Sequence, residues 1–167
     1  MNLHPILVLV LSFSCLSAAC GQEGGSKSAA SAFFAALKAG NIKAVQSLVY
    51  QLPGQQERMA ARLTRLVERA KAVGAVPELS DGKEIVTVAM AIVKDTAKRP
   101  DGNADYDAVL LLNRDGKWLV VMSIAEVEDR AGIFTGDERK QLAQLREWQD
   151  ARMKQLAEQA GSPKESK

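Results

Sequence analysis

The pattern of hydrophobic and polar positions predicts helices in the first half of the chain. Residues 28–40 place apolar side chains on one side of a helix, and Gly40 supplies its C-cap. Asn41 can N-cap a second, short helix that ends before Pro53. Residues 55–73 carry apolar side chains three and four positions apart, which predicts a third helix.

The pattern then changes from a helical period to an extended one. Residues 83–94 are rich in β-branched side chains and are predicted as one strand. One face of that strand would carry Val86, Val88, Met90 and Ile92. Residues 104–113 and 117–124 are predicted as two further strands, joined by a tight turn at residues 114–116 (Arg-Asp-Gly). We expect these two strands to form an antiparallel hairpin.

A last, amphipathic helix is predicted over residues 135–160, where Thr135 and Glu138 have the spacing of a capping box. Its apolar side is formed by Leu142, Leu145, Met153, Leu156 and Ala160, with Trp148 at the edge. Gln149 and Arg152 interrupt this side, so the helix does not have the regular heptad pattern of a coiled coil. Two interpretations stay open: the helix packs back on its own domain, or it offers a surface to a partner or a second copy.

The start of the chain indicates export. An apolar run that begins at Ile6 ends in residues 16–20 (Leu-Ser-Ala-Ala-Cys), where small side chains precede a cysteine. This pentad resembles the lipobox of bacterial lipoproteins, which implies removal of the preceding peptide and acylation of Cys20 by fatty-acid chains such as palmitate. The run is shorter than the roughly 20 residues of a transmembrane helix, and secretion with plain cleavage is the alternative.

These patterns define the expected domain organisation. We expect a signal peptide (1–19), a tether (20–27), an α+β domain (28–134), a C-terminal helix (135–160) and a flexible tail (161–167). The protein would be lipid-anchored and would face the periplasm or the cell surface. Gly21 after the cysteine favours the outer membrane over the inner one, because Asp at that position would resemble an inner-membrane retention signal.

Composition narrows the chemistry that this protein could perform. The sequence has 2 Cys and 1 His, and both Cys15 and His4 lie in the segment expected to be removed. The mature chain would then have no His and no free thiol, which excludes Ser-His-Asp and Cys-His nucleophiles and His- or Cys-ligated zinc or haem. We predict no cofactor and no metal. The net charge of +2 provides no general electrostatic attraction to nucleic acid, and we expect no nucleic-acid partner.

Helices followed by an antiparallel sheet predict an α+β fold, with the N-terminal helices packed on a curved sheet. Residues 32–41 (Ala-Phe-Phe-Ala-Ala-Leu-Lys-Ala-Gly-Asn), the second short helix and residues 115–120 (Asp-Gly-Lys-Trp-Leu-Val) resemble the cone-shaped fold of nuclear transport factor 2, a cystatin-like α+β fold. The chain also resembles the small bacterial lipoprotein families within that fold. The resemblance covers residues 28–127 and implies a cavity between the sheet and the first and third helices.

Enzymes of this fold, such as ketosteroid isomerases, use a carboxylate base with Tyr or acid donors. The resemblance therefore makes Phe34, Tyr106, Asp107 and Trp118 the candidate pocket residues, with Asp105 beside them. Neighbours on a strand face opposite sides, so Tyr106 cannot share a face with Asp105 or Asp107. The interpretation favoured for these residues is a tyrosine within the sheet and two solvated carboxylates, and for Trp118 it is packing in the hairpin.

Four arginines of the third helix, Arg58, Arg62, Arg65 and Arg69, are spaced by four, three and four residues and share one narrow face. They could bind an anionic ligand, lipid phosphates or an acidic partner through forked hydrogen bonds. The structural alternative is a solvated stripe, or pairing with acids such as Glu126, Glu128 and Asp129.

The function favoured by these observations is that of a lipid-anchored envelope protein that binds a ligand or a protein without catalysis. One alternative is a small-molecule isomerase or hydrolase of the cone fold that uses Asp and Tyr. Another is a structural or assembly protein of the envelope. The expected partners are the membrane, through the N-terminal lipid, and a protein or second copy bound through the C-terminal helix or the sheet.

Overall fold

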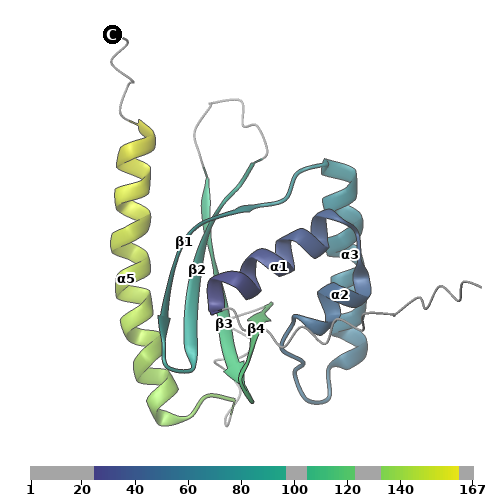
Figure 1. Cartoon of the computed structure of the whole chain (residues 1–167), viewed down its shortest axis with the longest axis horizontal. Helices are drawn as coiled ribbons and strands as arrows, with labels where there is room; N and C mark the ends of the chain where they lie inside the picture. Colours follow the sequence, from purple (N-terminus) through teal and green to yellow (C-terminus); the bar gives the residue numbers. More distant parts are fainter. Residues whose placement is uncertain (1–24, 97–104, 123–132, 162–167) are drawn as a thin grey trace, which may run out of the picture.

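The computed structural model describes residues 25–96, 105–122 and 133–161. Its elements are α1 (Ser26–Lys38), α2 (Ile42–Ser47), α3 (Gln56–Val73), β1 (Glu78–Ile85), β2 (Val88–Lys94), β3 (Tyr106–Arg114), β4 (Lys117–Val121) and α5 (Gly136–Gly161). They form three layers, with α5 on one face of the sheet and α1 to α3 on the other (Figure 1). The predicted α+β fold is confirmed. The expected signal peptide, Cys20 and the residues after Gly161 lie outside the described ranges.

Local capping signals explain where the N-terminal helices begin and end. α1 starts at Ser26, two residues earlier than expected and inside the segment expected as a tether. Gly40 has φ 66° and follows the C-cap, while the N–H of Asn41 reaches back to the carbonyl of Ala36 at 3.0 Å. The side chain of Asn41 then accepts a hydrogen bond from the Ala44 N–H at 3.1 Å, which confirms it as the N-cap of α2.

The prediction of a single strand over residues 83–94 was wrong. The chain turns back at Val86 and Thr87, so that Ile85 pairs with Val88 and the sheet has four strands rather than three. Val86 therefore lies at the tip of a hairpin, where its side chain is 77% exposed, and not on an inner face. Its φ of 46° is strained for a β-branched residue, and no Gly or Asn marks the turn.

The sheet is an antiparallel meander in the order β1-β2-β3-β4. Asp115 (φ 54°) and Gly116 (φ 78°) form the turn between β3 and β4, which confirms the predicted hairpin. The outer edge of β4 is partly covered, because the N–H of Tyr50 donates to the Val120 carbonyl at 2.8 Å. The outer edge of β1 carries several charged side chains and an irregularity after Leu79, features that discourage edge-to-edge pairing.

Both faces of β2 are buried. Glu84 pairs with Ala89 and accepts a hydrogen bond from the first residue of α1, so that face lies under α1. Asp81 pairs with Ile92 and is bonded to Arg152 of α5, so the other face lies under α5. The face toward α1 has Ala89, Ala91 and Val93, and the face toward α5 has Val88, Met90 and Ile92, all 2% exposed or less. The expected alternation is therefore confirmed from Val88 onward.

The C-terminal helix packs on its own domain, as the first of the two interpretations expects. Leu142, Leu145 and Leu156 of α5 are buried, and α5 packs along β2 and β1. The helix thus folds back on its own domain, and most of its apolar side is occupied by the sheet.

Arg152, which interrupts the apolar side of α5, belongs to an ion-pair cluster at the edge of the sheet. Its Nε donates to Asp81 at 2.7 Å, while Lys27 of α1 lies 3.4 Å from the other oxygen of the same carboxylate. Burial alone raises the pKa of Asp81, but the Gly82 N–H, Arg152 and Lys27 outweigh it and hold the pKa below 3.8. Asp81 therefore connects the helices on opposite faces of the sheet.

The start of α5 is fixed by Glu138, a carboxylate whose side chain is only 6% exposed. It accepts the Thr135 N–H at 2.9 Å, and its own N–H donates to the Thr135 hydroxyl at 3.2 Å, which confirms the predicted capping box. Both its oxygens also accept hydrogen bonds from Arg114 at the end of β3. Burial raises the pKa of Glu138, but the bonds from Arg114 and Thr135 outweigh it and hold the pKa below 4.5.

Candidate functional site

A cavity of about 590 Å³ lies between α1, α3 and the sheet, and we call it the cone cavity. Its apolar lining consists of Phe33, Phe34, Leu37, Leu66, Pro77, Val93, Ala108, Val109, Val120, Val121 and Met122. The phenylalanines come from α1, where their rings meet edge to face at 5.2 Å between centroids. These side chains give the cavity a wall suited to apolar ligands.

One side of the cone cavity is acidic. Asp95, Asp105 and Asp107 line it where β2 ends and β3 begins. The N–H of Asp95 donates to the Asp105 carbonyl at 2.8 Å, which holds the two strand ends together. The exposed side chain of Asp107 accepts the N–H of Ala108 at 2.7 Å.

The structure brings together three of the four candidate pocket residues. Phe34, Tyr106 and Asp107 line the cone cavity, whereas Trp118 does not. Trp118 pairs with Asn113 beside the β3–β4 turn, at the far end of β3 from Asp107, and is 4% exposed. Its burial in the core agrees with the packing role expected for it.

Tyr106 and Asp107 do not converge. Tyr106 pairs with Lys94 and Asp107 pairs with Val93, so their side chains leave the sheet on opposite faces. Asp107 shares the face toward α1 with Val93, while Tyr106 belongs to the face that α5 partly covers. The two residues therefore line the cone cavity from opposite faces of β3.

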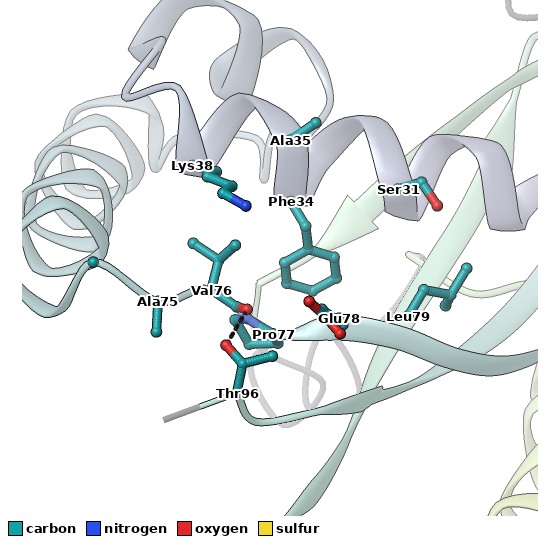
Figure 2. A pocket seen from close by; sticks show the side chains of 11 residues that line it. Ser31, Phe34, Ala35, Lys38, Ala75, Val76, Pro77, Glu78, Leu79 and Thr96 are labelled. Atoms are coloured by element: carbon teal, nitrogen blue, oxygen red, sulfur yellow. Dashed lines mark hydrogen bonds between the residues drawn. The ribbon is translucent and has the colours of Figure 1, made fainter. Parts of the chain in front are cut away.

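A second cavity of about 640 Å³ adjoins the first, and Phe34 and Pro77 line both. Figure 2 shows the ring of Phe34 pointing from α1 toward Pro77 and Glu78. Lys38 and Thr96 also line this cavity, and the Thr96 hydroxyl donates to the Val76 carbonyl at 2.8 Å. Sequence reasoning missed this cavity because the connection from α3 to β1 that forms one wall carries no motif.

The arginines of α3 form part of a third hollow, of about 430 Å³. It is lined by Gln55, Arg58, Met59, Ala61, Arg62 and Arg65, and we call it the arginine groove. Three of the four predicted arginines thus line one groove, while Arg69 does not. The acids considered as their partners, Glu126, Glu128 and Asp129, lie outside the described residues.

Within residues 25–96, 105–122 and 133–161, no group of three or more His, Cys, Asp or Glu side chains is arranged to hold a metal ion. In the same ranges, no helix combines the length and the apolar character needed to cross a membrane.

No protein-family model matches the chain, and no curated protein matches its sequence. The chain is structurally similar to solved NTF2-like and cystatin-like α+β proteins. A Campylobacter jejuni protein named as an NTF2-like transpeptidase is 20% identical over 60% of this chain and 100% of its own, with a TM-score of 0.47. An uncharacterized cystatin-fold protein from Novosphingobium aromaticivorans is 15% identical over 57% and 95% of the two chains, with a TM-score of 0.40.

Proposed function

We propose that this chain is a lipid-anchored, non-catalytic binding module of the cell envelope, and that an apolar ligand occupies the cone cavity. The observation that carries the proposal is the cavity itself. At about 590 Å³ it has the size of small-molecule sites in proteins, and phenylalanine and aliphatic side chains form most of its lining. Burial of an apolar ligand against that lining would supply the free energy of binding.

The position of the polar groups supports binding rather than acid–base catalysis by the candidate pair. A general base and its proton donor must both reach the reacting atoms of one substrate. Tyr106 and Asp107 both line the cavity but leave β3 on opposite faces, so the two side chains would not meet one substrate from the same side.

The proposed anchor agrees with the position of α1. Because α1 begins at Ser26, only six peptide units separate Cys20 from the domain, and they span at most about 21 Å when fully extended. Acylation of Cys20 would therefore hold the cone cavity close to a bilayer, where apolar ligands are concentrated.

The cavity is tested by filling it. Val109 lies on the cavity side of β3, opposite Ala91 of β2, and the larger side chain of Val109→Phe would occupy part of the space. We expect the affinity of the full chain for the neutral fluorescent probe N-phenyl-1-naphthylamine to fall at least about tenfold, because the probe and the new ring would overlap sterically. Fluorescence titration measures the change.

The matched control is Val73→Phe, which makes the same replacement at a side chain that is 55% exposed at the end of α3. Circular dichroism first establishes that both variants are folded. The control should bind the probe like the native chain. Equal probe binding by Val109→Phe and the native chain would refute the cone cavity as the ligand site.

A further inference from the structure

We infer that the second cavity binds the headgroup of a zwitterionic amphiphile, a molecule with one apolar chain and a head that carries both an anionic and a cationic group. Binding of such a ligand rests on the proposed function, because its apolar chain would occupy the cone cavity. The two cavities share Phe34 and Pro77 in their linings, so they meet at these side chains. A ligand that passes Phe34 would therefore occupy both cavities at once.

The second cavity carries two charges of opposite sign. Among residues 25–96, 105–122 and 133–161, its charged lining consists of Lys38 on α1 and Glu78 at the start of β1, both exposed. Neither residue forms an ion pair within the same ranges. The Lys38 amine attracts a phosphate or carboxylate, and the Glu78 carboxylate attracts an ammonium group. A zwitterionic head therefore matches both charges, whereas a singly charged head matches one and is repelled by the other.

The spacing of residues on α1 places the cation beside the junction of the two cavities. Ser31, Phe34 and Lys38 are three and four residues apart, so they share one face of the helix, and all three line the second cavity. Helical side chains lean toward the N-terminus of their helix, which brings Lys38 back toward Phe34. Figure 2 shows Lys38 and Glu78 around the Phe34 ring. The two charges thus lie near the point where a headgroup would join its chain.

Hydroxyl groups add hydrogen-bonding capacity to the second cavity. The Thr96 hydroxyl donates its proton to the Val76 carbonyl at 2.8 Å, so its oxygen is oriented as an acceptor for an ammonium group. Ser31 on α1 is exposed and adds a hydroxyl on the same wall as Lys38. Most of the cone cavity lining is apolar by contrast. The polar head and the apolar chain of one ligand would therefore each meet a lining of matching character.

The size of the cavities favours a ligand with a single chain. Each has the volume of one small-molecule site, about 590 Å³ for the cone cavity and about 640 Å³ for the second. A single-chain amphiphile also leaves a bilayer at a lower cost than a phospholipid with paired chains, since fewer methylene groups leave their apolar surroundings. We therefore expect one acyl chain in the cone cavity and one headgroup in the second.

The test measures how three ligands displace N-phenyl-1-naphthylamine from the full chain at neutral pH, below the concentrations at which they form micelles. Lauroyl lysophosphatidylethanolamine carries both charges, laurate only the anion and dodecylamine only the cation. Lys38→Gln and Glu78→Gln each remove one charge of the second cavity. The matched controls, Lys43→Gln and Glu57→Gln, remove the same charges from exposed positions that line neither cavity. Circular dichroism establishes that each variant is folded.

We expect the native chain to bind lauroyl lysophosphatidylethanolamine at least about tenfold more tightly than either singly charged ligand. Lys38→Gln should weaken binding of the zwitterion and of laurate about tenfold without weakening that of dodecylamine. Glu78→Gln should weaken binding of the zwitterion and of dodecylamine about tenfold without weakening that of laurate. The two controls should change each affinity by less than about threefold, because their charges are solvated and distant from the head.

Losses no larger in the cavity variants than in the controls would overturn the inference, as would equal losses for all ligands in one variant. The native chain binding the zwitterion no more tightly than laurate or dodecylamine would also overturn it. These outcomes leave the proposed function standing, because the neutral probe reports on the cone cavity alone. If the native chain does not bind the probe, the proposed function fails and the inference fails with it.

Discussion

Glu138→Ala is expected to lower the free energy of unfolding by about 3–5 kcal/mol. The substitution leaves Arg114 without the carboxylate that both its terminal nitrogens contact, and it removes the acceptor of the Thr135 N–H. The Glu138 side chain is 6% exposed, so water replaces these contacts poorly. Urea unfolding followed by circular dichroism measures the change.

The neighbouring Asp137 provides the control, since its side chain is 84% exposed and pairs with exposed Lys140. Asp137→Ala should cost less than about 1 kcal/mol. A similar cost for both substitutions would show that the contacts of Glu138 do not stabilise the fold.

The same carboxylate predicts a dependence of stability on pH. Because the folded-state pKa of Glu138 is held below 4.5, its contribution is complete above the pKa of the unfolded chain and is lost as the pH falls through the folded-state pKa. The native chain should therefore lose more stability than Glu138→Ala when the pH is lowered from about 5 through the folded-state pKa of Glu138. If the free energy of unfolding fell equally with pH in the native chain and in Glu138→Ala, the assigned role of Glu138 would be contradicted.

Leu145→Ala is expected to cost about 2–5 kcal/mol, because the side chain is fully buried where α5 packs on the sheet. The shortened side chain leaves a cavity against the face of β2 that carries Met90 and Ile92. The measurement is again urea unfolding, with Val73→Ala, 55% exposed, as a control expected to change stability by less than about 0.5 kcal/mol.

The dependence of stability on protein concentration provides a second, independent test of how α5 packs. If the helix packs on its own domain, the stability loss of Leu145→Ala should not depend on protein concentration. A loss that grows on dilution would mean that the helix is held by a second copy. A loss below about 1 kcal/mol would contradict the packing of Leu145 against the sheet.

Features that depend on neighbouring residues were predictable from the sequence. Gly40 and Asn41 carry the signals that end α1 and start α2, and Thr135 and Glu138 carry the signal that starts α5. In each case the hydrogen bond joins residues at most five positions apart, so the spacing of residue types is sufficient to recognise it.

Features that depend on distant residues were not predictable. Arg152 appeared only as an interruption of an apolar pattern, because its partner Asp81 lies 71 positions away. The turn at Val86 has no turn residue, and the surrounding structure imposes its left-handed conformation. Phe34 was recognised as a pocket residue only through the resemblance, because its cavity needs α3 and three strands to close it.

The most direct test of the central claim concerns Cys20, because an anchor there decides which ligands reach the cone cavity. Cells expressing the native chain or Cys20→Ala are labelled with radioactive palmitate, and the purified protein is counted. We predict that the native chain carries label in the membrane fraction and that Cys20→Ala carries none. Equal labelling of the two chains, or no label in either, would contradict a lipid anchor at Cys20.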